Sequence, residues 1–272
     1  MTPITHDTMY NIRPRQNGFS LIELMVAVLI GLFLTLGLSQ IFLSMYSTSK
    51  SENVLSQYQS NQRQAIVALT NSVQLAGYYP ATSTITTIGP NTSALPATTN
   101  SSPGDGSQFT AGAGIVGTTG SGTPEQDTLN IQYQSSGSDN VYNCQGGLVT
   151  SATTVIDSFS INAANNQLIC TVTVAGTTTA SLVLANNVHS MTILYGVDTT
   201  GGSTTPPPAD TTNTYMNAKT VTADGYWLYV RSVQITLNFC TPNVISAGAP
   251  VAASTCNSPT SWVQTINLMV KS

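Results

Sequence analysis

The sequence predicts an α+β fold, in which one long N-terminal helix spans a membrane with its first half and packs on an antiparallel β-sheet domain with its second half. Three observations predict this fold. An apolar run of 25 residues, Phe19 to Leu43, contains a single charged residue. A helical apolar stripe continues behind this run without a helix breaker. The rest of the chain consists of short β-rich segments that are separated by glycine, asparagine and aspartate.

The apolar run is long enough to cross a bilayer. As a helix at about 1.5 Å per residue it reaches roughly 37 Å, whereas the hydrocarbon core of a bilayer is ~30 Å thick. A secretory signal peptide is the alternative, but its apolar core has only about 7 to 15 residues and precedes a small-residue cleavage site. Arg13 and Arg15 come shortly before the run. Because basic residues stay in the cytoplasm, we expect the chain after Leu43 to lie across the membrane.

Glu23 is the one charged residue within the run. A carboxylate in lipid is costly and needs a partner, but the run contains no basic residue. Cleavage between Gly18 and Phe19 would create an α-amine four residues before Glu23, about 6 Å away along a helix. That amine, on the same chain or on a neighbouring one, would place a positive charge at the depth of the carboxylate.

The motif G-F-S-L-I-E, residues 18–23, and the apolar run behind it resemble the processing site of type IV pilins and pseudopilins. The resemblance implies that a prepilin peptidase removes residues 1–18 as a leader peptide and methylates the new N-terminus, Phe19. It also implies that Glu23 is the assembly glutamate. Later segments, "QLAGYYP", "DTLNIQY", "CQGG", "QLIC" and "ILYGVD", are similar to PilW-type minor pilins.

A PilW-type minor pilin is a structural subunit without catalytic residues. The resemblance implies that this chain joins other minor pilins and the major pilin at the filament tip and primes assembly of a type IV pilus, with a tip adhesin as a further candidate partner. Cell adhesion and twitching motility are the expected processes. Before assembly we expect a single-pass inner-membrane protein with its C-terminal domain in the periplasm, and afterwards a pilus component at the cell surface. The alternatives are a J-type minor pseudopilin of a type II secretion system and, in another class, an envelope-anchored ligand-binding module.

The composition argues against several functions. Only 7% of the residues are charged, against roughly 25% in typical soluble domains. Without the leader the chain keeps five basic and ten acidic side chains, and the basic ones are scattered in sequence. Since nucleic-acid affinity depends on clustered cations, we expect no specific nucleic-acid partner. There is no G-x-S-x-G or H-E-x-x-H motif, so we expect neither an enzyme nor a cofactor.

Four cysteines follow the span, on the side that we expect to be oxidising, and therefore predict disulfides. Three pairings are compatible with four cysteines, and we favour the two local ones, Cys144 with Cys170 and Cys240 with Cys256. PilW-type relatives often have a cysteine after the A-G-Y-aromatic turn, where this chain has Pro80, which leaves the first pairing open. The mature chain has one histidine and no C-x-x-C spacing, so we expect no metal site.

The predicted domain boundaries follow from these patterns. The helix should cover 19–76, with 19–43 in the membrane or filament core and Gly77 as its C-cap. Residues 77–124, rich in Ser, Thr and Gly, should form a variable loop region, and 125–272 a β-rich domain with a disulfide loop at 240–256. We expect one antiparallel sheet, laid against a stripe of the helix. The stripe consists of Leu55, Tyr58, Gln62, Ile66, Leu69, Val73 and Ala76. In the segment "WLYVRSVQITLNF", residues 227–239, one face of a half-buried strand carries Tyr229, Arg231, Val233, Ile235, Leu237 and Phe239. In the last strand, one face carries Trp262, Ile266, Leu268 and Val270.

Overall fold

The computed structural model describes residues 18–80, 95–99, 107–122, 125–199, 212–240, 256 and 259–269. The chain divides into two units, Met1–Ser51 and Glu52–Ser272, which are treated separately below. Three predicted features lie wholly or partly outside the described residues. They are residues 1–17 of the leader, residues 81–94, 100–106 and 123–124 of the loop region, and the interior of the 240–256 loop.

Helix α1 (Leu21–Gln74) supplies residues to both units. It begins two residues later and ends two residues earlier than predicted, and a turn carries the chain on to Gly77. Gly77 has a φ of +75°, a left-handed conformation that glycine adopts without steric cost. Its backbone N–H donates to the carbonyl oxygen of Gln132 at 3.0 Å. The end of the helix is therefore joined directly to the sheet domain within the second unit.

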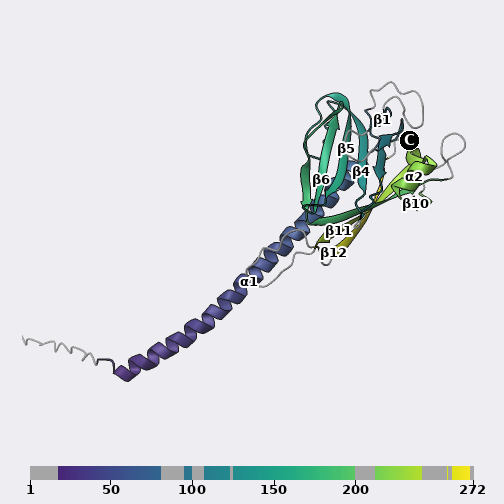
Figure 1. The fold of residues 1–272 in the computed structure, drawn as a ribbon. Coiled ribbons are helices and arrows are strands. Elements are labelled where there is room, and N and C mark those ends of the chain that lie inside the picture. The colour runs from purple at the N-terminus through teal and green to yellow at the C-terminus, as the bar shows by residue number, and fades with distance from the viewer. Residues whose placement is uncertain are drawn as a thin grey trace, which may run out of the picture. The chain divides into compact units, whose positions relative to one another are not determined.

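The described residues of the second unit form three antiparallel sheets, where the sequence predicted one (Figure 1). The largest has the order β3-β4-β5-β6-β7, with β8 also paired to β6; the second has the order β10-β9-β11-β12; the third consists of β1 and β2. The bounds are β1 (Thr98–Thr99), β2 (Gln108–Phe109), β3 (Ile115–Thr118), β4 (Thr128–Ser136), β5 (Ala152–Asn162), β6 (Gln167–Val174), β7 (Thr177–Thr178), β8 (Leu182–Asn186), β9 (Val188–Val197), β10 (Thr214–Met216), β11 (Val230–Cys240) and β12 (Pro259–Asn267).

One residue separates the last strand of the largest sheet from the first strand of the second. Asn187, with a φ of +62°, lies between β8, which pairs with β6, and β9, which pairs with β10 and β11. Asparagine tolerates this left-handed conformation better than most side chains. Alternation of apolar residues predicts strands but says nothing about such a change of sheet, so the sequence pattern could not distinguish one sheet from three.

The core of the second unit lies between the sheets and the C-terminal part of α1. The helix buries Tyr58, Ala65, Leu69, Ser72 and Val73, and the ring of Tyr58 meets that of Phe239 edge to face with centroids 6.2 Å apart. Of the face predicted for β11, Val233, Ile235, Leu237 and Phe239 are buried and Arg231 is half-buried, whereas Tyr229 lies in the turn before the strand. Of the predicted helical stripe, Leu55 is exposed, and Gln62 and Ile66 are half-buried.

Trp262 and Ile266 share one face of the last strand as predicted, since both line a small hollow with Leu69 of α1, but they are buried to different degrees. Ile266 is buried and Leu268 half-buried, but Trp262 is 43% exposed; Val270 lies outside the described residues. The reason is the position of β12 at the edge of its sheet, where among the described strands only β11 pairs with it. An edge strand buries less of its inward face than a central one, because it has a neighbour on one side only.

Two further elements were not predicted. Helix α2 (Ala218–Asp224) begins at Asn217, whose side chain accepts a hydrogen bond from the N–H of Thr220 at 2.9 Å, and ends at Gly225 with a φ of +71°. A 3-10 turn, Tyr226–Tyr229, follows where the sequence analysis placed the start of a strand. Its Trp227 is buried and packs edge to face on Tyr195, with 4.9 Å between ring centroids.

Candidate assembly site

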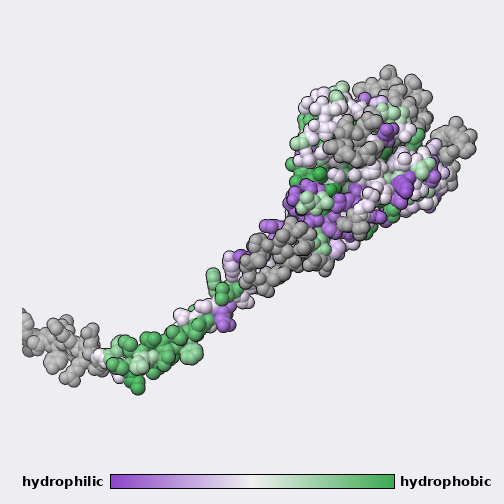
Figure 2. Space-filling model, viewed as in Figure 1, coloured by the Kyte–Doolittle hydropathy of each residue, from purple (hydrophilic) through white to green (hydrophobic). Residues whose placement is uncertain are grey.

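The first half of α1 presents apolar side chains on every side. In its most apolar 18-residue window no residue is buried, and among the described residues this is the one helix that is long and apolar enough to cross a membrane. Figure 2 shows this segment as a continuous hydrophobic surface. A helix that is apolar all round is stable only in lipid or among other apolar helices. By length and composition, the segment is therefore suited to a membrane or to a bundle of apolar helices.

The proposed processing site precedes the helix. Gly18 and Phe19 are exposed and lie outside α1, whose first backbone bonds run from the N–H groups of Glu23 and Leu24 to the carbonyl oxygen of Ser20, at 3.0 and 3.2 Å. Among the described residues, no heavy atom lies within 4 Å of the position that a side chain at Gly18 would occupy. The structure therefore places the Gly18–Phe19 bond on exposed, non-helical backbone.

Glu23 lies in the first turn of α1 and is exposed. Among the residues of α1 before Lys50 it is the only charged one. The N–H groups of a first turn lack partners within the helix, so their partial positive charge favours a carboxylate at this position. The helix terminus stabilises Glu23 only in part, and a full positive charge would still be needed to offset its burial in lipid.

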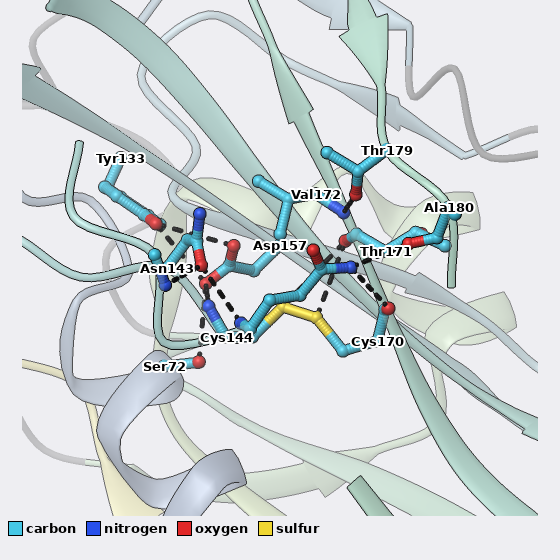
Figure 3. Close-up of a disulfide and its surroundings, with 12 residues drawn as sticks. Ser72, Tyr133, Asn143, Cys144, Asp157, Cys170, Thr171, Val172, Thr179 and Ala180 are labelled. Carbon is cyan, nitrogen blue, oxygen red and sulfur yellow. Dashed lines mark hydrogen bonds between the residues drawn. A yellow bond between two sulfur atoms is a disulfide. The ribbon is translucent and has the colours of Figure 1, made fainter. Parts of the chain in front are cut away.

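A buried carboxylate joins α1 to the sheet domain. Asp157, on β5, is fully buried; it accepts a hydrogen bond from the backbone N–H of Cys144 at 3.0 Å. The hydroxyl groups of Ser72, on α1, and Tyr133, on β4, donate to the same carboxylate at 3.4 Å. Figure 3 shows these side chains directed toward Asp157 beside the disulfide. Sequence reasoning missed this cluster, because the three partners are separated in sequence and only the fold brings them together.

Burial raises the pKa of Asp157 to about 7 and outweighs the hydrogen bonds from Cys144, Ser72 and Tyr133, which favour the charged form. Burial also raises the pKa of Tyr133, and the neighbouring Asp157 adds to that effect. The folded state therefore holds a proton on Asp157 that the unfolded chain, with an aspartate pKa of about 3.9, releases.

Stability should consequently fall as the pH rises from about 4 through 7. The fold favours the neutral form of Asp157. Its contribution to the free energy of unfolding is therefore fully present below pH ~4 and is lost above pH ~7, and ~4 kcal/mol is the upper limit of that contribution. Urea unfolding of the purified full chain, with intact disulfides, should show this decline between pH 5 and pH 8. Asp157→Asn should remove most of it, with a smaller remainder from Asp127, whose pKa burial also raises.

The matched control is Asp224→Asn, since Asp224 is exposed on α2. This variant should keep the full pH dependence. An equally steep decline in Asp157→Asn would show that Asp157 is not the group that titrates.

Both pairs of cysteines form disulfides in the structure. Cys144 is bonded to Cys170, with Cα atoms 6.4 Å apart, and Cys240 to Cys256, with Cα atoms 5.1 Å apart. The first joins the "CQGG" turn to β6; the side chain of Gln145 in this turn also donates to the carbonyl oxygens of Cys170 and Ala180, at 3.1 and 2.8 Å. The second closes the connection between the paired strands β11 and β12.

One group of side chains has the spacing of a metal site. The ligand atoms of His189, Cys240 and Cys256 lie within 4.8 Å of one another. However, the two cysteines are bonded to each other, and a disulfide offers no thiolate to a metal. His189 lies near the start of β9, with its Nδ1 3.3 Å from the Oδ1 of Asn166.

Two family models match separate parts of this chain, and one solved structure is similar to it. A model of the prokaryotic N-terminal methylation motif matches residues 13–39, and a model described as Type IV Pilus-assembly protein W matches residues 155–260. Among solved structures, a type IV-like pilin from Thermus thermophilus is similar at 10% identity and a TM-score of 0.38, over 77% of this chain and 96% of that chain. No curated protein matches the chain. The methylation motif in front of a PilW domain confirms the resemblance to type IV pilus minor pilins of the PilW type.

Proposed function

We propose that this chain is a structural, non-catalytic subunit that primes the assembly of a type IV pilus within a complex of minor pilins at the filament tip. The observation that carries the proposal is the exposed apolar half of α1 with Glu23 in its first turn, in the same chain as a PilW domain. An apolar helix of this length anchors the chain in a membrane before assembly and can pack among the corresponding helices of other pilins afterwards. In this proposal the N-terminus is cytoplasmic and the second unit lies outside the inner membrane.

The PilW match favours a pilus over a type II secretion system, and one experiment separates the two. Surface filaments and secreted proteins are measured in the same deletion strain. The proposal predicts a large loss of filaments with normal secretion, restored by the wild-type gene. Loss of secretion with normal filament numbers would assign the chain to the secretion system as a J-type minor pseudopilin.

Processing provides a second test. Because Gly18 leaves space for a peptidase at an exposed, non-helical bond, the mature protein should begin at N-methyl-Phe19. Mass spectrometry of the N-terminal peptide from envelope fractions should find this residue in cells with an active prepilin peptidase, and the intact precursor in cells without one. An unmodified Met1 terminus in the first strain would contradict the proposed leader, residues 1–18.

A further inference from the structure

A polar hollow lies at one end of the four-stranded sheet. Its volume is about 620 Å³, and it is lined by Thr212, Tyr215, Arg231, Ser232, Asn267, Leu268 and Met269. These residues come from β10, β11 and β12 and from the segments next to them. The hollow belongs entirely to the second unit and includes none of the residues assigned above to processing or assembly.

Arg231 supplies the positive charge of this hollow. It lies at an irregularity in the pairing of β11 with β9, where the register shifts between Val230 and Ser232. Such a bulge changes the direction of a side chain relative to the regular strand. The Nε of Arg231 is buried and has no hydrogen-bond partner in the described part of the chain. A buried donor without a partner is costly, and in a native protein it calls for a ligand or another explanation.

Three hydroxyl groups, of Thr212, Tyr215 and Ser232, line the same hollow as this guanidinium. The Oγ of Ser232 lies 2.9 Å from the Oγ1 of Thr212 and 3.2 Å from the Oη of Tyr215. Gly196 makes this close approach feasible, because a Cβ there would lie 2.6 Å from the Cγ2 of Thr212 and would also overlap the Ser232 hydroxyl. Three hydroxyls carry three donors, and the two hydrogen bonds within the cluster use two of them. Among the described residues, one O–H donor is therefore left over in the hollow that Arg231 also lines.

The rim of the hollow has the composition of a protein interface. Tyr215 is 43% exposed and Met269 66% exposed, and Leu268 is half-buried beside them. Tyrosine, methionine and arginine are the residue types that protein interfaces enrich, and arginine and tyrosine often dominate their binding energy. A phosphate polymer would need several clustered cations, whereas this hollow contains one.

We propose that the hollow binds the carboxylate of an acidic side chain of a partner protein. The planar guanidinium of Arg231 suits a carboxylate held by two parallel N–H···O bonds, and the spare hydroxyl donor adds a third. Leu268 and Met269 contact the apolar stem that carries the carboxylate. The site does not involve Glu23 or the apolar helix. This proposal and the proposed function are therefore independent, and a result that contradicts one leaves the other unaffected.

The test uses the purified full chain in detergent, with the methyl group of Met269 observed by NMR. The probe is N-acetyl-glutamic acid N-methylamide, whose only charge is the side-chain carboxylate, and the corresponding glutamine compound is its neutral control. We expect a saturable shift of the Met269 methyl signal with the first compound and none with the second. Arg231→Gln should weaken binding at least tenfold and Thr212→Val about threefold. Arg63→Gln, at an exposed arginine of α1, should bind as the wild type does.

Three results would overturn the proposal. One is the absence of a saturable shift of the Met269 methyl signal in the folded wild type, with no shift either in folded Thr212→Val and Arg63→Gln. Another is tighter binding of glucuronate than of the glutamyl compound, which would assign the hollow to a sugar acid. The third concerns Asp210, which precedes Thr212 by two residues and lies outside the described residues. If only Asp210→Asn binds the probe, the chain's own carboxylate occupies the site.

Discussion

Replacing Glu23 with Gln is expected to reduce the number of surface filaments by roughly tenfold and to lower the recovery of sister pilins with this chain. In the proposed assembly, the α-amine of a processed Phe19 would lie at the same depth as Glu23 of the subunit that packs beside it. Attraction between the two charges is strong at low dielectric, although desolvation offsets much of it, so the pair mainly specifies the register between subunits. Electron microscopy and co-purification of sister pilins measure the two effects.

The substitution should leave membrane insertion and cleavage after Gly18 intact, because uncharged glutamine is less costly in an apolar span than glutamate is. Glu52→Gln is the matched control, since Glu52 lies on the same helix but beyond the apolar run, and it should behave as the wild type. Wild-type filament numbers and wild-type recovery of sister pilins in the Glu23→Gln strain would show that the carboxylate is dispensable.

Gly114→Ala is expected to destabilise the second unit by about 3 kcal/mol or more. The carbonyl oxygen of Gly114 accepts a hydrogen bond from the N–H of Gln132 at 2.8 Å, next to the bond from Gly77 to Gln132. A Cβ at Gly114 would lie 2.5 Å from the Cα of Gly77 and 2.8 Å from the carbonyl carbon of Ala76. These are backbone atoms, so the end of α1 would have to move away from the sheet.

The comparison is with Gly176→Ala. Gly176 has a φ of +81°, but no heavy atom lies within 4 Å of the position that a Cβ would occupy there. Alanine at this position should therefore lower the free energy of unfolding only by the cost of a left-handed backbone conformation, about 1 kcal/mol. Urea unfolding of both variants measures the difference. Equal and small losses for the two would show that Gly77 and Gly114 are not in close contact.

The long helix and most strands of the second unit were predictable because their signals are local. An apolar run of 25 residues and the alternation in β11 need no knowledge of the rest of the fold. Helix α2 was not predicted, because its seven residues carry too little periodicity, although Asn217 and Gly225 are residue types that favour helix ends. The division into three sheets was not predictable, because strand pairing depends on contacts distant in sequence.

The candidate sites differ in the same way. Gly18, Phe19 and Glu23 lie within six residues, so a short motif identifies them without a structure. Asp157 and Arg231 each have an ordinary sequence context. Their roles depend on partners that only the fold supplies, such as Ser72 and Tyr133 for Asp157 and the hydroxyl cluster for Arg231.

Immunogold labelling of sheared filaments tests the central claim most directly. Antibodies against the second unit would be applied to filaments from the wild type, with filaments from a strain lacking the chain as the control for specificity. A subunit that primes assembly at the tip should give label at one end of each filament. Label spread along the filament length, or filaments without label in normal numbers, would contradict a priming role at the tip.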